Sequence, residues 1–322
     1  MLMSEPIRVL TFNIYIGHPY YLLEGKHSLA QSFRLDSQIE EIKKLKPDIF
    51  CLQEMYSSNL LDIYKEHFPD FKCFYVKDTI AFNHIALYAI ILASYLYILH
   101  LPLNTEYILS LFVLFSSCYY YFIFYTTPGI FINGNIRTAN VIFYRKDKFK
   151  FKNGRAHYFH NQDGDILNMG RKRGFITLNL TYKDKEIQII NCHLSNKQDT
   201  LERYQPPVSN INRYEQVLQL IKTLELKNTQ IPIVICGDFN SSNTTLEVSK
   251  LKEYMSQTLA ETYNHTWSKS NDLTSLFHIC DDHQADYIFY KSLKCINGTM
   301  VFNNIKPNLS DHYGVFSSLI FL

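Results

Sequence analysis

Residues 79–136 constrain the fold of this chain most, because they carry a single charged side chain, Glu106. Charged residues make up 19% of the whole sequence, so this segment differs sharply from its flanks. It holds two long uncharged runs, Ile85–Leu103 and Tyr107–Tyr125. As helices these runs would each be about 29 Å long, close to the roughly 30 Å hydrocarbon core of a bilayer. We therefore predict that residues 79–136 form an inserted hydrophobic hairpin at a membrane.

The flanks of this segment predict how such a hairpin would be oriented. Lys72 and Lys77 precede it and Arg137 and Arg145 follow it, whereas the turn between the two runs has no Lys or Arg. The positive-inside rule then places both flanks in the cytoplasm. We expect a membrane-anchored protein whose catalytic domain faces the cytoplasm, with the hairpin either spanning the bilayer or lying in the interface. The alternative is a pair of buried helices, and the N-terminus does not have the pattern of a signal peptide.

Charge and cysteine content narrow the class of protein further. The 32 basic and 30 acidic residues give a net charge of +2, so no global field attracts nucleic acid, and we expect nucleic acid to be an unlikely partner. The seven cysteines are scattered without CxxC spacing, which indicates a reducing compartment and argues against a zinc site. The composition does not predict an oligomeric state.

Outside the hydrophobic segment, apolar strands alternate with amphipathic helices, which favours a layered α/β or α+β sandwich with mixed sheets. We predict one domain built from residues 1–78 and 137–322. Helices are expected at 28–45, 57–67 and 211–226. Strands are expected at 7–15, 48–54, 71–77, 139–145, 174–182, 186–193, 231–238, 285–290, 295–302 and 312–321.

Six short motifs with polar side chains stand at the ends of these strands. They are TFNI with Asn13, LQE with Glu54, NCHL with His193, GDFN with Asp238 and Asn240, ADYIFY with Asp286, and SDH with Asp311 and His312. Taken alone, a motif of this kind is more often explained by a strand-end hydrogen bond, a turn or a buried histidine. The ordered set is more specific, because it combines hard oxygen ligands suited to Mg²⁺ with a histidine next to one of them.

The same residues resemble those of the endonuclease/exonuclease/phosphatase superfamily, the deoxyribonuclease-like fold. The resemblance covers residues 7–78 and 137–322, and it implies a four-layered sandwich of two mixed β-sheets with helices outside. It also implies metal-dependent hydrolysis of a phosphoric ester. In that comparison Glu54 binds Mg²⁺, with Mn²⁺ as a substitute, and Asn13 and Asp311 lie nearby.

The resemblance implies roles for the remaining motif residues as well. Asp238 and Asn240 would position the nucleophile and the phosphate. His312, oriented by Asp286, would activate water, and His193 would stabilise the charge that develops on the phosphate. This division agrees with general acid–base and electrostatic catalysis.

Within the superfamily the sequence is most similar to neutral sphingomyelinases. The stretch RKRGFITLNL, which contains Arg173, resembles their Lys/Arg-Gly-Phe strand, and Arg213 with Gln216 resembles a second pattern. Arg173 is therefore a candidate phosphate-binding residue. We expect hydrolysis of a membrane phospholipid, sphingomyelin to ceramide and phosphocholine. The alternatives are a phosphoinositide or other lipid phosphatase, a deoxyribonuclease-like nuclease, and a membrane scaffold that retains the fold without activity.

Overall fold

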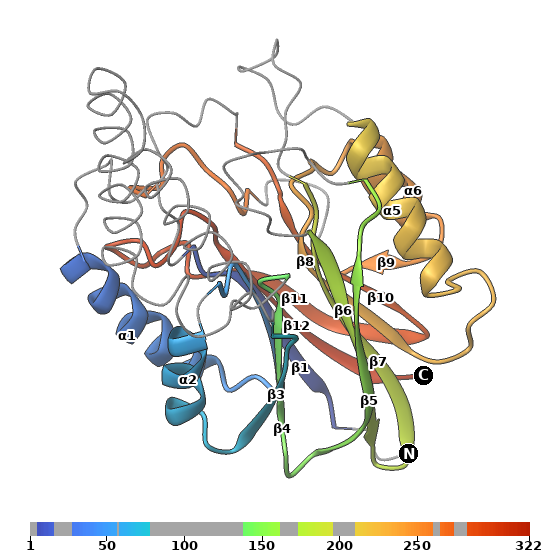
Figure 1. The fold of residues 1–322 in the computed structure, drawn as a ribbon, viewed down its shortest axis with the longest axis horizontal. Coiled ribbons are helices and arrows are strands. Elements are labelled where there is room, and N and C mark those ends of the chain that lie inside the picture. The colour runs from blue at the N-terminus through green and yellow to red at the C-terminus, as the bar shows by residue number, and fades with distance from the viewer. Residues whose placement is uncertain are drawn as a thin grey trace, which may run out of the picture.

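Two six-stranded sheets pack face to face between two layers of helices (Figure 1). The computed structural model describes residues 5–15, 28–56, 58–77, 138–161, 173–195, 210–259, 265–273 and 282–322. The first sheet has the order β11 (Leu293–Val301), β12 (Gly314–Phe321), β1 (Ile7–Asn13), β2 (Ile49–Gln53), β4 (Val141–Arg145) and β3 (Phe71–Phe74). The second has the order β5 (Phe149–Tyr158), β6 (Gly174–Tyr182), β7 (Lys185–His193), β8 (Ile233–Asp238), β10 (Asp286–Lys291) and β9 (Ser256–Gln257).

Both sheets are mixed, which places several strand ends at one edge. β1 runs parallel to β2, and β7 runs parallel to β8, whereas the neighbouring pairs β1–β12 and β8–β10 are antiparallel. The carboxyl ends of β1 and β2 therefore lie beside the amino end of β12. The carboxyl ends of β7 and β8 lie beside the amino end of β10 in the same way.

The apolar periodicity of the strands explains the layers. In β1, Val9 packs between the two sheets, while Leu10 and Phe12 pack against the outer helices. Apolar residues on both faces of a strand are typical of a sheet that is covered on both sides.

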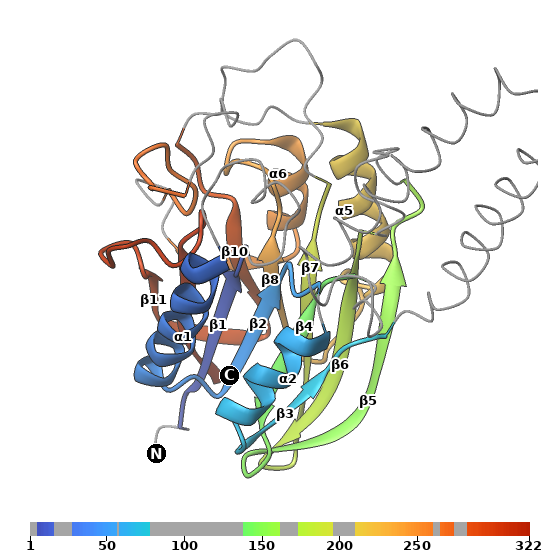
Figure 2. The same ribbon diagram turned by 60° about the vertical axis from the view of Figure 1, so that its left-hand side comes forward.

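The helices cover the two outer faces of the sandwich (Figures 1 and 2). α1 (Ser28–Leu45) and α2 (Ser58–His67) cover the first sheet, while α5 (Ile211–Thr223) and α6 (Leu246–Lys252) cover the second. α5 begins at Asn210, whose side chain accepts hydrogen bonds from the backbone amides of Asn212 and Arg213, as an N-cap does. The predicted sandwich of two mixed sheets flanked by helices is confirmed.

Three elements are absent from the sequence prediction: β5, α6 and the short β9. β5 is an edge strand in which Lys150, Lys152 and Arg155 are exposed, so its apolar signal is weak, and it is held by backbone pairing with β6. α6 has seven residues and β9 has two, and elements this short carry little periodicity.

The prediction of a membrane-anchored protein facing the cytoplasm is wrong for the chain as described. Within the described ranges, no helix is both long enough and apolar enough to cross a bilayer. The longest described helix, α1, has 18 residues and carries charged side chains, including Arg34, Asp36 and Glu40. The run of apolar residues at 79–136 satisfies the composition of a span, but composition alone does not establish one. That segment lies outside the described residues, so the inserted hairpin and the domain boundaries that depend on it stay predictions.

Candidate active site

Four of the predicted site residues stand at the carboxyl ends of the two parallel strand pairs. Asn13 ends β1 and Glu54 directly follows β2, while His193 ends β7 and Asp238 ends β8. Asn13 belongs to the first sheet and Asp238 to the second, yet Nδ2 of Asn13 donates a 3.0 Å hydrogen bond to Oδ2 of Asp238. This bond connects the two sheets at the edge where the site residues lie.

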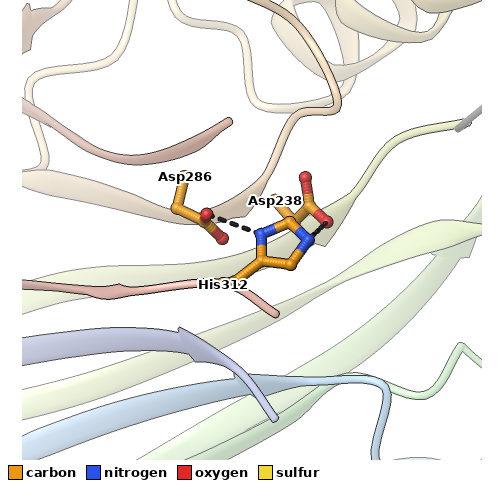
Figure 3. Close-up of side chains that lie close together, drawn as sticks. All are labelled: Asp238, Asp286 and His312. Atoms are coloured by element: carbon orange, nitrogen blue, oxygen red, sulfur yellow. Dashed lines mark hydrogen bonds and ion pairs between the residues drawn. The ribbon is translucent and has the colours of Figure 1, made fainter. Parts of the chain in front are cut away.

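The antiparallel neighbours bring in the other half of the site. Asp286 begins β10 and stands opposite Asp238 in the strand register, and His312 lies just before β12. Nδ1 of His312 lies 2.8 Å from Oδ2 of Asp286, and Nε2 of the same ring lies 3.8 Å from Oδ2 of Asp238 (Figure 3). The imidazole is thus held between two carboxylates.

Asp238 is the centre of this arrangement. Besides Asn13 and His312, its carboxylate accepts a 2.8 Å hydrogen bond from the backbone amide of Asn240 and lies 3.4 Å from Nε2 of His193. The side chain of Asn240 in turn donates to the carbonyl of Leu194, next to His193. A carboxylate with this many donors is rigidly oriented.

The backbone around Asp238 is fitted tightly to the neighbouring strand. Gly237 has φ of 152°, and a Cβ there would lie 1.9 Å from the carbonyl oxygen of Cys192, so a side chain is excluded. Asn240 and Glu54 both adopt left-handed backbone conformations, with φ of 47° and 63°. Such conformations are uncommon outside glycine and cluster at functional sites.

The two site histidines differ in charge. Burial alone would lower the pKa of His312, but the carboxylates of Asp286, Asp238 and Asp311 outweigh it and raise that pKa well above its ordinary value. Burial lowers the pKa of His193 well below its ordinary value, and the positive charge of Arg173 lowers it further. The protein therefore holds His312 protonated and His193 neutral.

Arg173 lies directly before β6, where Gly174 pairs with His193. Its Nη1 atom lies 2.6 Å from Nδ1 and 2.5 Å from Nε2 of His193. A positive guanidinium this close disfavours a second positive charge on the ring, which agrees with the lowered pKa of His193. The structure therefore places the candidate phosphate-binding arginine at the site.

A cluster of buried carboxylates provides a fit for a divalent cation. Oε2 of Glu54 is buried and has no hydrogen-bond partner among the described residues. Burial raises the pKa of Glu54, and the charge of Asp238 raises it further. Burial, together with Glu54 and Asp238, raises the pKa of Asp311 to about 7. Buried acids that raise one another's pKa are the arrangement that a bound cation relieves, and the amide oxygen of Asn13 adds a neutral ligand atom.

A second group of possible ligands, Asp238, Asp286 and His312, places its ligand atoms within 4.8 Å of one another (Figure 3). In this group the imidazole is protonated and already bonded to Asp286, so it would have to lose its proton to bind a metal. The oxygen-rich group around Glu54 fits Mg²⁺ or Mn²⁺ better, because both ions prefer carboxylate and carbonyl oxygens.

Two hydroxyl residues that support the site were not singled out from the sequence. Oγ of Ser310 donates a 2.6 Å hydrogen bond to the backbone carbonyl of Asn13 and accepts one from the amide of His312. Oγ1 of Thr266 accepts hydrogen bonds from the amides of Ala285 and Asp286. Ser310 stands inside the SDH motif, which is a usable signal, whereas nothing near Thr266 in the sequence points to the site.

Residues 10–312 match the model described as the endonuclease/exonuclease/phosphatase family. The chain belongs to this family. Its enzymes are phosphoric ester hydrolases that use divalent metal ions. No curated protein matches the sequence significantly.

Solved structures share the fold at low sequence identity. An endonuclease/exonuclease/phosphatase from Bacteroides vulgatus is 16% identical with a TM-score of 0.64, covering 99% of this chain and 100% of its own. D. rerio TDP2 complexed with single strand DNA product is 12% identical, with a TM-score of 0.62 and coverage of 98% and 99%. The human Nocturnin catalytic domain with bound sulfate anion is 17% identical, with a TM-score of 0.59 and coverage of 100% and 97%. These likenesses show the fold, and the finer resemblance to neutral sphingomyelinases stays a prediction.

Proposed function

We propose that the chain hydrolyses a phosphoric ester with the help of a divalent metal ion. The observation that carries this proposal is that Asn13 and Asp238 join the two sheets beside the Asp286–His312 pair and beside the buried Oε2 of Glu54, which has no hydrogen-bond partner among the described residues. These side chains are costly to bury, and a purely structural core would not gather them.

Glu54, Asn13 and Asp311 are the residues that would hold the metal. When bound, a divalent ion neutralises charge on the phosphoryl and leaving oxygens. The requirement for a metal is proposed from these residues, and we expect Mg²⁺, with Mn²⁺ as a substitute.

The protonation states favour a particular division of labour among the other residues. Burial alone would raise the pKa of Asp238, but His312, His193 and the hydrogen bonds to its carboxylate lower it, so Asp238 stays ionised. Asp238 is therefore suited to accept a proton from the attacking water. His312, protonated and oriented by Asp286, would give its proton to the leaving oxygen as the P–O bond breaks. The sequence prediction assigned water activation to His312, and the charges favour Asp238 for that role.

His193 and Asn240 both contact Asp238, and Arg173 contacts His193. A cationic guanidinium and a side-chain amide are suited to bind the equatorial phosphoryl oxygens, where charge develops in the transition state. We propose that these three residues bind the phosphate.

For the substrate we propose a phospholipid head group, with sphingomyelin first. One observation on the described residues supports a lipid surface. Ile211 and Leu246 are 65% and 64% exposed, and they begin α5 and α6, the helices that follow the strands ending in His193 and Asp238. Exposed apolar side chains on helices that follow these strands are suited to touch lipid.

A nucleic acid is the second candidate, because the fold neighbour from D. rerio is complexed with a single strand DNA product. Against it stands the near-neutral net charge of the chain. A phospholipid and a nucleic acid would use the same metal site, and they differ only in the groups attached to the phosphate.

The test offers the purified full chain four substrates side by side: sphingomyelin vesicles, phosphoinositide vesicles, single-stranded DNA, and the small diester bis-p-nitrophenyl phosphate. Each is assayed with Mg²⁺, with chelator, and with His312→Ala. His67→Ala serves as the matched control, because His67 is exposed at the end of α2. Hydrolysis that is lost with chelator and with His312→Ala, but kept in His67→Ala, supports the proposal. Folded protein that cleaves none of the four overturns it.

A double variant separates the two substrate classes. Ile211→Asp combined with Leu246→Asp should lower the rate on sphingomyelin vesicles about tenfold or more while leaving bis-p-nitrophenyl phosphate hydrolysis unchanged. Equal rates on vesicles for the double variant and the wild type would contradict a lipid-facing surface. Cleavage of DNA alone would favour the nucleic acid substrate.

A further inference from the structure

The backbone of residues 266 and 267 connects the chain segment that leads to Asp286 with the segment that carries His312. Trp267 forms an antiparallel bridge with His283 on one side and another with His312 on the other. The bridge to His283 has two 3.1 Å backbone hydrogen bonds. On the other side, the backbone amide of Tyr313 donates a 2.6 Å hydrogen bond to the carbonyl of Thr266. We call residues 266 and 267 the strap.

The strap matters because Asp286 and His312 come from different sheets. Asp286 begins β10 of the second sheet, and His312 lies two residues before β12 of the first. Their 2.8 Å contact therefore depends on how the two sheets are held relative to each other at this edge. The strap is hydrogen-bonded to His283 and Asp286 in the segment of the carboxylate, and to Tyr313 in the segment of the imidazole.

The hydroxyl of Thr266 acts on Asp286 directly. Oγ1 of Thr266 accepts hydrogen bonds of 2.8 Å from the amide of Ala285 and 2.9 Å from the amide of Asp286. Thr266 is fully buried, so the two amides would lose their partner in the interior if this hydroxyl were removed. The same residue thus fixes the backbone of Asp286 with its side chain and the backbone next to His312 with its carbonyl.

We propose that Thr266 is a positioning residue for the Asp286–His312 pair. Thr266 is hydrogen-bonded to Ala285, Asp286 and Tyr313, and it acts by setting the separation and orientation of the Asp286 carboxylate and the His312 imidazole. A displacement of about 1 Å at a catalytic group can lower a rate by about 100-fold. The kinetic part of this inference rests on the proposed hydrolysis, and the structural part does not.

The test compares three substitutions in the full chain. Thr266→Val keeps the shape of the side chain but removes the acceptor oxygen, whereas Thr266→Ser keeps the hydroxyl. Thr177→Val is the matched control, because Thr177 is also buried, lies within β6, and donates a hydrogen bond to the backbone carbonyl of Arg155. If Thr266→Val does not fold, Thr266→Cys takes its place, since a thiol is a smaller side chain and a weak acceptor.

Two readouts separate positioning from a general loss of stability. The first is the kinetics on bis-p-nitrophenyl phosphate, where Thr266→Val should lower kcat between about 10- and 100-fold with little change in KM. Thr266→Ser and Thr177→Val should stay near wild type. The second is the downfield proton NMR signal of the His312 Nδ1–H, identified by its loss in His312→Gln. That signal should shift or broaden in Thr266→Val and stay in place in both other variants.

The outcomes are distinct. Wild-type kcat together with an unchanged Nδ1–H signal in Thr266→Val would overturn the proposal. A comparable kinetic loss in Thr177→Val would also overturn it, because the effect would then come from buried threonines in general. If the wild type hydrolyses no phosphoric ester, the proposed function fails, and the NMR signal still decides whether Thr266 positions the pair.

Discussion

Individual buried charges are the features of this molecule that most require explanation. Glu54, Asp238, Asp286 and Asp311 are all at most 9% exposed, and the positive groups that act on them are His312, Arg173 and Arg34. The pKa values of Glu54 and Asp311 are raised in spite of these positive charges, so the acids are not fully offset. At the scale of residues, the site is therefore short of positive charge, and a cation completes it.

Substituting Glu54 should separate metal binding from folding. In Glu54→Gln we expect an activity loss of about 100-fold or more, because a metal ligand contributes several kcal/mol to transition-state stabilisation. In chelator the same variant should be more stable than wild type by on the order of 1–3 kcal/mol, because a buried charge has been removed. Thermal unfolding with and without Mg²⁺ measures this. A variant that gains as much stability from Mg²⁺ as wild type would contradict the assignment.

His157 predicts a pH effect outside the site. Burial, followed by Arg155, lowers the pKa of this histidine from the ordinary 6.5, so the folded state prefers the neutral ring. The unfolded state takes up the proton first as pH falls. The contribution to stability is therefore complete above the unfolded pKa and is lost as pH falls through the folded pKa.

His157→Phe tests this effect, because the ring stacks on Phe175 with centroids 4.6 Å apart and phenylalanine keeps that contact. The free energy of unfolding, measured by urea titration, should fall less between about pH 7 and pH 5 in the variant than in wild type. Identical pH dependence in the two proteins would show that His157 does not titrate differently on folding.

At the scale of elements, a buried amide network connects β7 to the first sheet. Nδ2 of Asn191 donates to the backbone carbonyls of Leu52 and Val141, at 2.8 and 2.9 Å. Its Oδ1 accepts a 2.7 Å hydrogen bond from Gln53, the residue before Glu54. One side chain of the second sheet thereby pairs with two strands of the first, close to Glu54 on one strand and His193 on the other.

We expect Asn191→Leu to lower the free energy of unfolding by about 2–5 kcal/mol, because the carbonyls of Leu52 and Val141 would lose this buried donor and Gln53 would lose one of its acceptors. Asn179→Ala is the matched control, since Asn179 lies near the surface of β6 and bonds to Asn153. The control should change stability by less than about 0.5 kcal/mol. Urea denaturation measures the free energy of unfolding of both variants. Equal small losses in the two would contradict the stabilising role of Asn191.

At the scale of the whole molecule, the first sheet pairs a strand that precedes residues 79–136 with a strand that follows them. β3 and β4 are antiparallel neighbours, and Phe74 pairs with Ile142 although residues 79–136 separate them in the chain. The ends of that segment therefore leave the sheet from adjacent strands, as the ends of a hairpin loop do. The pairing gives a physical reason why a long insertion is tolerated there, since loop closure costs little more for a longer loop.

Replacing residues 79–136 with a short Gly/Ser linker should leave the two sheets able to form. We expect the far-UV circular dichroism of a folded α/β protein and a cooperative thermal transition. Hydrolysis of bis-p-nitrophenyl phosphate should stay within about threefold of the full chain, because the site residues lie outside the segment. An unfolded product would contradict the predicted division into one domain and an insert.

Much of this architecture follows from local sequence patterns. The predicted strands around Ile7–Asn13, Ile49–Gln53 and Ile233–Asp238 lie where expected, because apolar runs bounded by polar or turn residues are a local signal. The motif residues at the strand ends come together because parallel strands share a carboxyl edge. Local patterns could not reveal β5, an edge strand whose two lysines are exposed, and the apolar composition of residues 79–136 did not by itself establish a membrane span.

The sequence by itself determined which strands and helices form and which polar side chains stand at their ends. Only the tertiary structure decided the charges of the two histidines, because the pKa of His312 depends on carboxylates from β8 and β10 and the pKa of His193 depends on Arg173. It also decided that Thr266 serves the Asp286–His312 pair. Strand and helix formation depends on neighbours in the chain, whereas electrostatics and strand-to-strand bonds depend on neighbours in space.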